Sequence, residues 1–478
     1  MTVPFVLDRT VSGPLHLQIA MRLRTAITAG VLTPGVRLPS ARSLAGQLGV
    51  ARGTVDAGYA VLIAEGVVVP RGSAGTIVSP DLAARVAPPA QRRMPFAPPR
   101  AEPPPAPLPF RMGLPALDAF PRKLWTSLIA RAARGLGAEA LALPDPSGWR
   151  PLREAIATYL GVSRGILCGP DQVLVTAGFQ GALALVAKLL LRTGDPVWVE
   201  DPGYLLARHA LEAAGATLVP VRVDRDGLRV AAGMVAAPRA RLAVVTPAHQ
   251  SPLGVALSLP RRLALLGWAA DAGAWVLEDD YDSEFRYTGH PLPALKSLDR
   301  GGRVLYAGSF SEVLFPALRL GYLVVPDELA EAFARASRLG SCGLPSLEQR
   351  VVATFMAEGH FARHLRRMRT LYAARRSVLA AALAAAFGDR MVLQLEAGGM
   401  HLLARFPGAA DDGTLARRAA AAGLAPTALS SLVAAHDCGQ GLLLGFANVP
   451  EAEAEARVRL LAGAVGLGAA REATVLAK

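Results

Sequence analysis

The chain has 478 residues and a formal net charge of +13, and its 52% hydrophobic and 19% charged residues exclude a disordered or fibrous protein and predict two or three globular domains. No apolar run reaches the roughly 18 residues of a membrane span, and residues 1–10 lack the pattern of a secretory signal. Because the three cysteines (Cys168, Cys342 and Cys438) have neither disulfide nor ligand spacing, we expect buried small side chains, no metal site and a soluble cytoplasmic protein.

A first domain is predicted over residues 11–80, as three helices followed by a hairpin. Apolar residues at every fourth position from Leu15 to Ile27 form one face of the first helix. Ser40 can cap a second helix, which Gly49 ends. The second and third helices are close enough in sequence to form a helix-turn-helix.

The third helix would point Val55, Tyr59 and Leu62 inward. Strands at 67–69 and 76–78, joined by a Gly-Ser-Ala-Gly turn, then complete a hairpin that is typical of the wing of a winged helix. The same periodicity also fits a small three-helix bundle that never touches DNA. The motifs decide between the two.

Residues 38–45, 48–55 and 72–76 resemble the GntR family of winged-helix regulators. The resemblance implies contacts with double-stranded DNA, with guanidinium groups on phosphates and guanine edges and the wing tip in the minor groove. The implied contact residues are Arg42, Arg52, Thr54 and Gly75. Residues 1–100 carry eleven arginines against four acidic residues, a net of +7, which suits a polyanionic partner but also a merely solvated surface.

Two features of this segment depart from the family pattern. Ala51 stands where a capping serine is usual, and Gly53 and Gly58 lie inside the third helix, each at a cost of up to about 1 kcal/mol relative to alanine.

Residues 81–109 contain ten prolines and predict a semi-rigid linker, largely of polyproline II conformation. After it, apolar strands alternate with helical segments, which predicts an α/β body with a mostly parallel sheet over residues 110–478. The strands are expected at 172–176, 196–200, 241–246, 274–278, 303–307 and 319–325. Ligands of such sheets bind at the carboxyl ends of the strands, where the polar motifs of this sequence lie.

From Phe110 to about Leu461 the chain resembles the fold type I, pyridoxal-phosphate-dependent aminotransferases, and with the winged helix in front it resembles the MocR subfamily of GntR regulators. The resemblance rests on residues 113–118, 152–156, 200–204, 278–285 and 359–361. It implies pyridoxal phosphate as a possible cofactor. It also implies a homodimer, because fold type I sites are usually completed at a dimer interface and paired winged helices read two half-sites.

The resemblance assigns cofactor roles to nine residues. Gly178, Phe179 and Gln180 would hold a phosphate on the N–H groups of a helix start, Tyr204 would stack on the pyridine ring, Asp279 would pair with the ring nitrogen, Tyr281 would bond the ring hydroxyl, and Ser309, Ser311 and Arg319 would form a second phosphate clamp. A plain strand-to-helix turn at Gly178, and a structural role for each of the others, are the alternatives.

One position breaks the aminotransferase pattern. After Ser309-Phe310-Ser311 the family places the lysine that forms a Schiff base with the cofactor, but this chain has Glu312. A carboxylate cannot form an imine, and it adds a negative charge beside a phosphate and Asp279 unless Arg319 or an amine-bearing ligand compensates it. We therefore expect no catalytic residue and, at most, non-covalent binding of pyridoxal phosphate.

Other positions are less decisive. Leu443 aligns with the arginine that many aminotransferases use for the substrate carboxylate, and His249 and His401 align with the pocket rim, although a packing role fits both histidines equally well. The arginines between 363 and 376 predict a solvated helix face or an additional contact with the DNA backbone.

Three functions fit these patterns. The first is a DNA-binding transcription regulator whose body binds a small effector. That effector could be related to vitamin B6 or an amino acid, as pyridoxal phosphate or its imine with an amino acid would be, or it could be an unrelated molecule. The second is a pyridoxal-phosphate-dependent aminotransferase that carries a DNA-binding module. The third is an interaction protein with a dead pocket. Glu312 favours the first.

Overall fold

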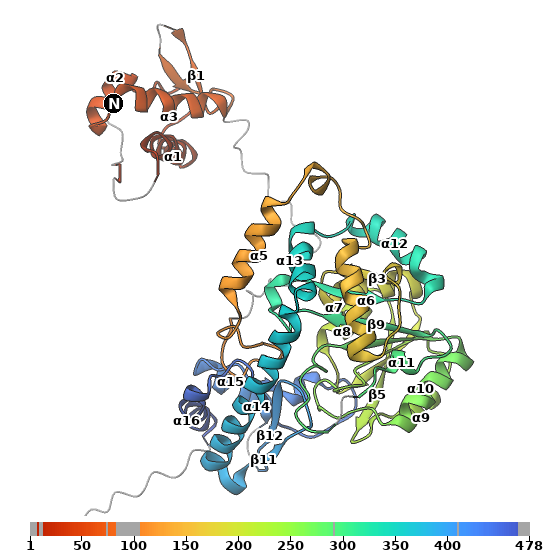
Figure 1. Ribbon diagram of the computed structural model, residues 1–478. Coiled ribbons are helices and arrows are strands. Elements are labelled where there is room, and N and C mark those ends of the chain that lie inside the picture. The colour runs from red at the N-terminus through yellow and green to blue at the C-terminus, as the bar shows by residue number, and fades with distance from the viewer. Residues whose placement is uncertain are drawn as a thin grey trace, which may run out of the picture. The chain divides into compact units, whose positions relative to one another are not determined.

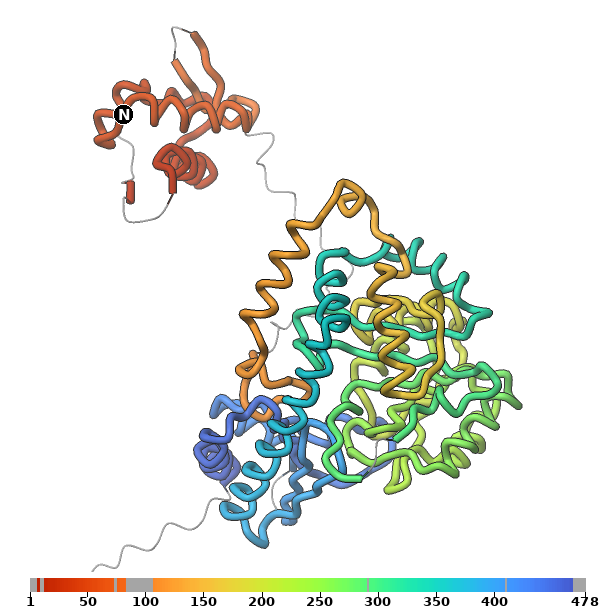
Figure 2. The backbone as a smooth tube through the Cα atoms, in the orientation of Figure 1, coloured from red at the N-terminus to blue at the C-terminus, as the bar shows by residue number. Residues whose placement is uncertain are grey.

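The computed structural model describes residues 7–8, 13–72, 75–82, 106–289, 292–408 and 411–466 (Figures 1 and 2). The chain divides into two compact units, Met1–Pro104 and Pro105–Lys478. Most of the expected proline linker, residues 83–105, lies outside the described residues. No helix of the described ranges is long and apolar enough to cross a membrane.

The N-terminal unit contains three helices and a two-stranded antiparallel hairpin, as predicted. Tyr59 donates a hydrogen bond of 2.7 Å to the Pro39 carbonyl, which ties the third helix to the start of the second. The side chains of Leu23, Leu44 and Leu62 are fully buried in the core of this unit. The elements are α1 Leu15–Thr28, α2 Ala41–Leu48, α3 Arg52–Ala64, β1 Val68–Pro70 and β2 Thr76–Val78.

Local capping explains where α2 and α3 begin and end. Ser40 Oγ accepts the Ser43 N–H at 3.2 Å, and Gly49 ends α2 with a φ of 64°. Ala51 makes no side-chain cap, which leaves the start of α3 without that support. A Cβ on Gly58 would lie 3.0 Å from the His16 carbonyl oxygen, so this glycine allows α3 to pack closely against α1. Gly53, in contrast, has open space around it.

The C-terminal unit is built on an eight-stranded sheet in the order β3-β10-β9-β8-β7-β4-β5-β6. Neighbouring strands from β9 to β5 pair in parallel, whereas β10 is antiparallel to both β3 and β9, and β6 is antiparallel to β5. The strands are β3 Val173–Thr176, β4 Pro196–Asp201, β5 Thr217–Asp224, β6 Gly227–Leu228, β7 Leu242–Val245, β8 Trp275–Asp280, β9 Val304–Ser309 and β10 Gly321–Val324.

Helices cover both faces of this sheet. Val197 and Val199 of β4 belong to one core with α7 and α8, whereas Trp198 points to the other face and stacks on Trp268 of α10 at 3.8 Å. Such alternation is what a sheet buried on both faces requires. The helices are α5 Arg122–Arg134, α6 Arg150–Arg164, α7 Gly178–Leu190, α8 Leu205–Ala213, α9 Val230–Ala236, α10 Leu259–Ala272, α11 Leu295–Leu298, α12 Asp327–Ser341, α13 Ser346–Ala357 and α14 His360–Phe387.

A second, antiparallel sheet was not predicted from the sequence. Its order is β11-β12-β14-β13, and it packs with the last helices beside α14, in the blue region of Figure 2. Its elements are β11 Val392–Gln394, β12 His401–Arg405, β13 Thr427–Ala428, β14 Leu442–Gly445, α15 Asp412–Ala421 and α16 Ala454–Val465. The strands are short, which explains why no alternating pattern revealed them.

The predicted strand 319–325 begins two residues late. A single 3-10 turn, η4 Pro316–Leu318, precedes it, and Arg319 ends that turn with a φ of 51°. Because Arg319 is in the left-handed conformation, it cannot belong to the strand. Its side chain therefore stands at the end of the sheet.

A buried ion pair joins α6 to the centre of the sheet. Arg164 Nη2 lies 2.5 Å from Asp280 Oδ2, and both side chains are almost completely buried. The Tyr306 hydroxyl donates a hydrogen bond of 2.7 Å to the same oxygen of Asp280. The carboxylate of Asp280 thus receives two partners from different elements.

Replacement of Arg164 by leucine should destabilise the C-terminal unit by about 3–5 kcal/mol, because it leaves the buried Asp280 without its cation. Urea unfolding of the full chain measures this loss. Arg150→Leu on the same helix is the matched control, since Arg150 pairs with Glu154 at the surface and should cost under about 1 kcal/mol. Equal losses in the two variants would contradict the importance of the buried pair.

Candidate functional site

A cavity of about 430 Å³ lies in the C-terminal unit, beside the ends of the central strands. The strands β4, β7, β8 and β9 are parallel, so the segments that follow them meet at one edge of the sheet. All of the predicted cofactor residues except Gly178 and Gln180 line this cavity. Its lining is Arg111, Met112, Gly113, Leu114, Phe179, Tyr204, Leu206, Ser251, Asp279, Tyr281, Asp282, Ser309, Ser311, Glu312, Pro316, Arg319, Met400 and His401.

Gly178 lies next to the guanidinium of Arg319, which lines the cavity. It is the first residue of α7 and has a φ of +70°, and a Cβ there would lie 3.3 Å from Arg319 Nη2. Arg319 Nη2 also donates a hydrogen bond of 3.0 Å to the Ala177 carbonyl. The exposed guanidinium is thus placed over the start of α7, where an anion would meet both a cation and helix N–H groups. Gln180 follows on this helix, and its buried side-chain nitrogen has no hydrogen-bond partner among the described residues.

Asp279 is a buried carboxyl group on the cavity wall. Burial raises its pKa well above the ordinary value, and the nearby negative charges of Glu312 and Asp280 raise it further. A buried carboxyl group of this kind gains most from a cationic partner, such as a protonated ring nitrogen. Tyr204 is 39% exposed, which leaves its ring free to stack on a ligand.

The two histidines occupy different places around Tyr281. His249 lies behind the cavity wall, with Nδ1 at 3.0 Å from both the Tyr281 hydroxyl and Asp282 Oδ2. His401 lines the cavity, and its Nε2 lies 2.8 Å from the Pro252 carbonyl oxygen. Burial, together with the charge of His249, lowers the pKa of His401 to about 4, so His401 is neutral at pH 7. His249 therefore positions Tyr281, and His401 contributes a neutral ring to the wall.

Glu312 brings a second carboxyl group to the same cavity. Its Oε2 atom is buried and has no hydrogen-bond partner among the described residues. Burial raises the pKa of Glu312 to about 7, against a hydrogen bond from Ser309 that lowers it. Lys188 on α7 and Lys296 on α11 do not line the cavity, and the Lys296 ammonium donates to the Val304 carbonyl at 2.6 Å.

Arg111 and Ser251 are polar cavity residues that the sequence did not single out. Arg111 comes from the segment before α5, and its Nη1 reaches the Ala106 carbonyl only at 3.5 Å. Ser251 comes from the loop after β7. Both are single polar residues in irregular segments, and only their place beside the cavity reveals them. Leu443 is fully buried on β14 in an apolar cluster that includes Met112, and it does not reach the cavity.

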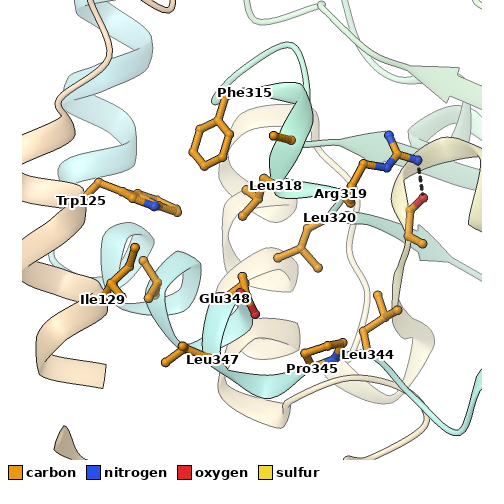
Figure 3. Close-up of a pocket in the computed structure, with 13 residues that line it drawn as sticks. Trp125, Ile129, Phe315, Leu318, Arg319, Leu320, Leu344, Pro345, Leu347 and Glu348 are labelled. Atoms are coloured by element: carbon orange, nitrogen blue, oxygen red, sulfur yellow. Dashed lines mark hydrogen bonds between the residues drawn. The ribbon is translucent and has the colours of Figure 1, made fainter. Parts of the chain in front are cut away.

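An apolar cavity of about 410 Å³ adjoins the first one. Figure 3 shows Trp125 and Ile129 of α5 facing Leu318 and Leu320 across it, with Arg319 at its edge. Arg319 lines both cavities.

The predicted DNA-contact residues lie on the helix-turn-helix and its hairpin. Arg42 in α2 and Arg52 at the start of α3 are exposed, and Arg52 Nε lies 3.4 Å from Asp56. Thr54 is half-buried in the first turn of α3. Gly75 has a φ of +84° at the base of the turn. The rest of the predicted wing tip, Ser73 and Ala74, lies outside the described residues.

Arg37 is a further basic residue that the sequence did not single out. A Cβ on Gly75 would lie 3.1 Å from Arg37 Nε, so the guanidinium lies against the hairpin. Exposed arginines thus lie on α2, on α3 and in the segment before α2 that packs against the hairpin.

Comparison with known proteins identifies both units. Residues 15–78 match the family described as bacterial regulatory proteins, gntR family, and residues 119–435 match the class I and II aminotransferases. The probable rhizopine catabolism regulatory protein MocR of Rhizobium meliloti is 41% identical over 93% of this chain and 92% of its own length. The chain belongs to the MocR-type GntR regulators. This MocR-type chain is also 33% identical to the HTH-type pyridoxine biosynthesis transcriptional regulator PdxR of Corynebacterium glutamicum, over 98% of this chain and 99% of PdxR.

The body of this MocR-type regulator has the aminotransferase fold. The α-aminoadipate aminotransferase LysN of Thermus thermophilus, solved in complex with N-(5'-phosphopyridoxyl)-L-leucine, superposes with a TM-score of 0.68 and 30% identity over 75% of this chain and 92% of LysN. Proteins of this fold family bind pyridoxal phosphate compounds, and GntR-type regulators bind DNA. The winged helix and the fold of the body are thus confirmed.

Replacement of Glu312 by glutamine should stabilise the ligand-free protein at pH 8 but not at pH 5. The pKa of Glu312 is about 7 in the folded chain against an ordinary 4.5, so the folded state holds the proton more tightly and loses up to about 3 kcal/mol of stability as the pH rises from 4.5 through 7. Glutamine removes that loss. Melting temperatures at the two pH values measure it.

The exposed Glu455→Gln variant is the control and should follow the native pH profile. A difference between Glu312→Gln and the native chain that is the same at pH 5 and pH 8 would contradict a buried, ionising Glu312.

Proposed function

We propose that this chain is a sequence-specific DNA-binding transcription regulator whose body binds a phosphorylated pyridine cofactor non-covalently as its effector. The observation that carries the proposal is a cavity with the cofactor-binding residue types of an aminotransferase but with Glu312, and no lysine, in its described lining. A regulator needs such a ligand to bind and leave. An enzyme of this fold needs an amine that the cavity does not offer.

The residues present suit such a cofactor. Asp279 would pair with the ring nitrogen, Tyr281 would bond the ring hydroxyl, and Tyr204 would stack on the ring. Ser309, Ser311 and Arg319, with the first N–H groups of α7, would hold the phosphate. The group, when bound, supplies an electron-withdrawing ring, which this chain would use for recognition rather than turnover.

The regulator is proposed to act as a homodimer. A phosphate site with an exposed Arg319 leaves the cavity open on one side, and the adjoining apolar cavity between α5 and α13 offers a surface for a second copy. Two winged helices in one dimer would read two half-sites of a DNA duplex.

Arg42→Ala and Arg52→Ala should each weaken binding to a duplex from the upstream region of the chain's own gene by at least about tenfold, because each removes a guanidinium contact to DNA. Fluorescence anisotropy at several salt concentrations measures the loss, and each variant should lower the salt dependence. Arg22→Ala, an exposed position on α1, is the matched control and should bind as the native chain does. Native binding that is absent or insensitive to salt would rule out the proposal.

The alternative function is an aminotransferase with a DNA-binding module, which the aminotransferase fold favours. We expect no multiple-turnover transfer of an amino group by the native chain with added pyridoxal phosphate, amino acids and 2-oxo acids, because no lysine lines the cavity within the described residues. Chromatography of the amino acid products checks this. Turnover that disappears in Tyr281→Phe would favour the enzyme instead.

A further inference from the structure

The cavity holds more acidic side chains than a pyridine ring nitrogen can use. Asp279, Asp282 and Glu312 line it, and the negative charges of Glu312 and Asp282 raise the pKa of Asp279. Asp282 Oδ2 lies 3.0 Å from His249 Nδ1. Asp279 is the partner of the ring nitrogen in the proposed function. Glu312 remains, with its buried Oε2 unpartnered among the described residues. An uncompensated carboxylate in such a place is costly, so its partner decides what the cavity prefers.

The described protein groups do not supply that partner. The cations in the lining are Arg111 and Arg319, and neither lies within ion-pair distance of an acidic group among the described residues. Arg319 is held over the start of α7 by the Ala177 carbonyl. His401 is neutral at pH 7 because its pKa is about 4.

Other acidic groups face Glu312 from neighbouring segments and strengthen its demand for a cation. Asp282 and Glu284, in the loop after β8, both raise its pKa. His249 Nδ1 lies 3.0 Å from Asp282 Oδ2, and Glu284 accepts a hydrogen bond of 2.8 Å from Tyr159. Among the described residues, Oε2 of Glu312 has neither an ion-pair partner nor a hydrogen-bond partner.

We propose that the cavity selects the amine form of the cofactor, a phosphorylated pyridine with a protonated aminomethyl group such as pyridoxamine phosphate, over the aldehyde form, and that Glu312 is the ion-pair partner of that ammonium. This inference rests on the proposed function. It goes beyond it by naming the chemical form of the effector and the residue that reads it.

The charges of the ligand and the cavity match group by group. The phosphate dianion meets Arg319, two serine hydroxyls and the N–H groups of α7, and the ring nitrogen meets Asp279. The ammonium then meets Glu312, which becomes a paired carboxylate. The aldehyde form instead places a carbonyl oxygen beside that carboxylate, so Glu312 must keep a proton for the aldehyde to bind. The amine form needs no such protonation.

Calorimetric titration of the full chain at pH 8 with pyridoxamine phosphate and with pyridoxal phosphate tests the inference. The native chain should bind the amine at least tenfold more tightly than the aldehyde. Glu312→Gln should lose most of this preference, because glutamine carries no charge. Glu312→Lys should reverse it: the amine should bind at least tenfold more weakly, and pyridoxal phosphate should form a covalent adduct that borohydride fixes and mass spectrometry locates at residue 312.

The matched control is Glu455→Gln, an exposed position on α16 that lines neither cavity and should leave both affinities unchanged. The whole chain has four lysines, so adducts at other positions give little background. Near-native DNA affinity and circular dichroism establish that each variant is folded. A conjugate of pyridoxamine phosphate, in which the aminomethyl nitrogen also carries alanine, tests whether the natural ligand is the simple amine or an amino-acid conjugate. Tighter binding of this conjugate than of pyridoxamine phosphate, lost in Arg111→Ala, supports the amino-acid conjugate.

Two results would overturn the inference and differ in what they leave standing. Aldehyde binding as tight as amine binding in the native chain, with no effect of Glu312→Gln, removes the preference but keeps the cofactor. Binding of neither compound removes both the preference and the cofactor part of the proposed function, while the DNA titrations stand separately.

Discussion

Four acidic side chains, Glu278, Asp279, Asp280 and Asp282, lie buried at the end of β8, and the architecture of the body depends on how each is compensated. Glu278 accepts the N–H groups of Leu295 and Lys296, both at 2.8 Å. Asp280 forms an ion pair with Arg164 and accepts a hydrogen bond from Tyr306, and Asp282 faces His249. Asp279 points to the opposite side of the strand from its two neighbours, into the cavity. Glu278 and Asp280 therefore fasten elements together, whereas Asp279 and Asp282 both line the cavity.

The parallel order of the strands explains why most of the cavity lining could be predicted from the sequence. Motifs around Tyr204, Asp279 and Ser309 are local in sequence, and each follows a parallel strand, so the carboxyl-end rule brings them to one cavity. The helix-turn-helix was equally accessible, because its caps at Ser40 and Gly49 and its apolar periodicity are written within single helices. Local patterns of this kind do not depend on contacts between distant segments.

The remainder depended on contacts between distant segments. Strand β5, which carries Pro220 and exposed positions within it, has a mixed burial pattern that does not stand out as a strand. Arg111 becomes a cavity residue only because the segment before α5 pairs with β14, where Phe110 bridges Gly445. The separation of His249 from the cavity by Tyr281 depends on Gly399, where a Cβ would lie 2.0 Å from the imidazole ring. No short-range signal encodes these arrangements.

Arg319 belongs to the walls of two cavities, one polar and one apolar. It lies on bare glycine backbone at Gly178 and is held by a single carbonyl, so its guanidinium has room to shift without disturbing the core. An anion that drew this side chain toward itself would also change the rim of the apolar cavity beside α5, where Arg319 stands at the edge (Figure 3). Through this one arginine, occupancy of the polar cavity would be linked to the shape of a neighbouring surface that the ligand itself does not touch.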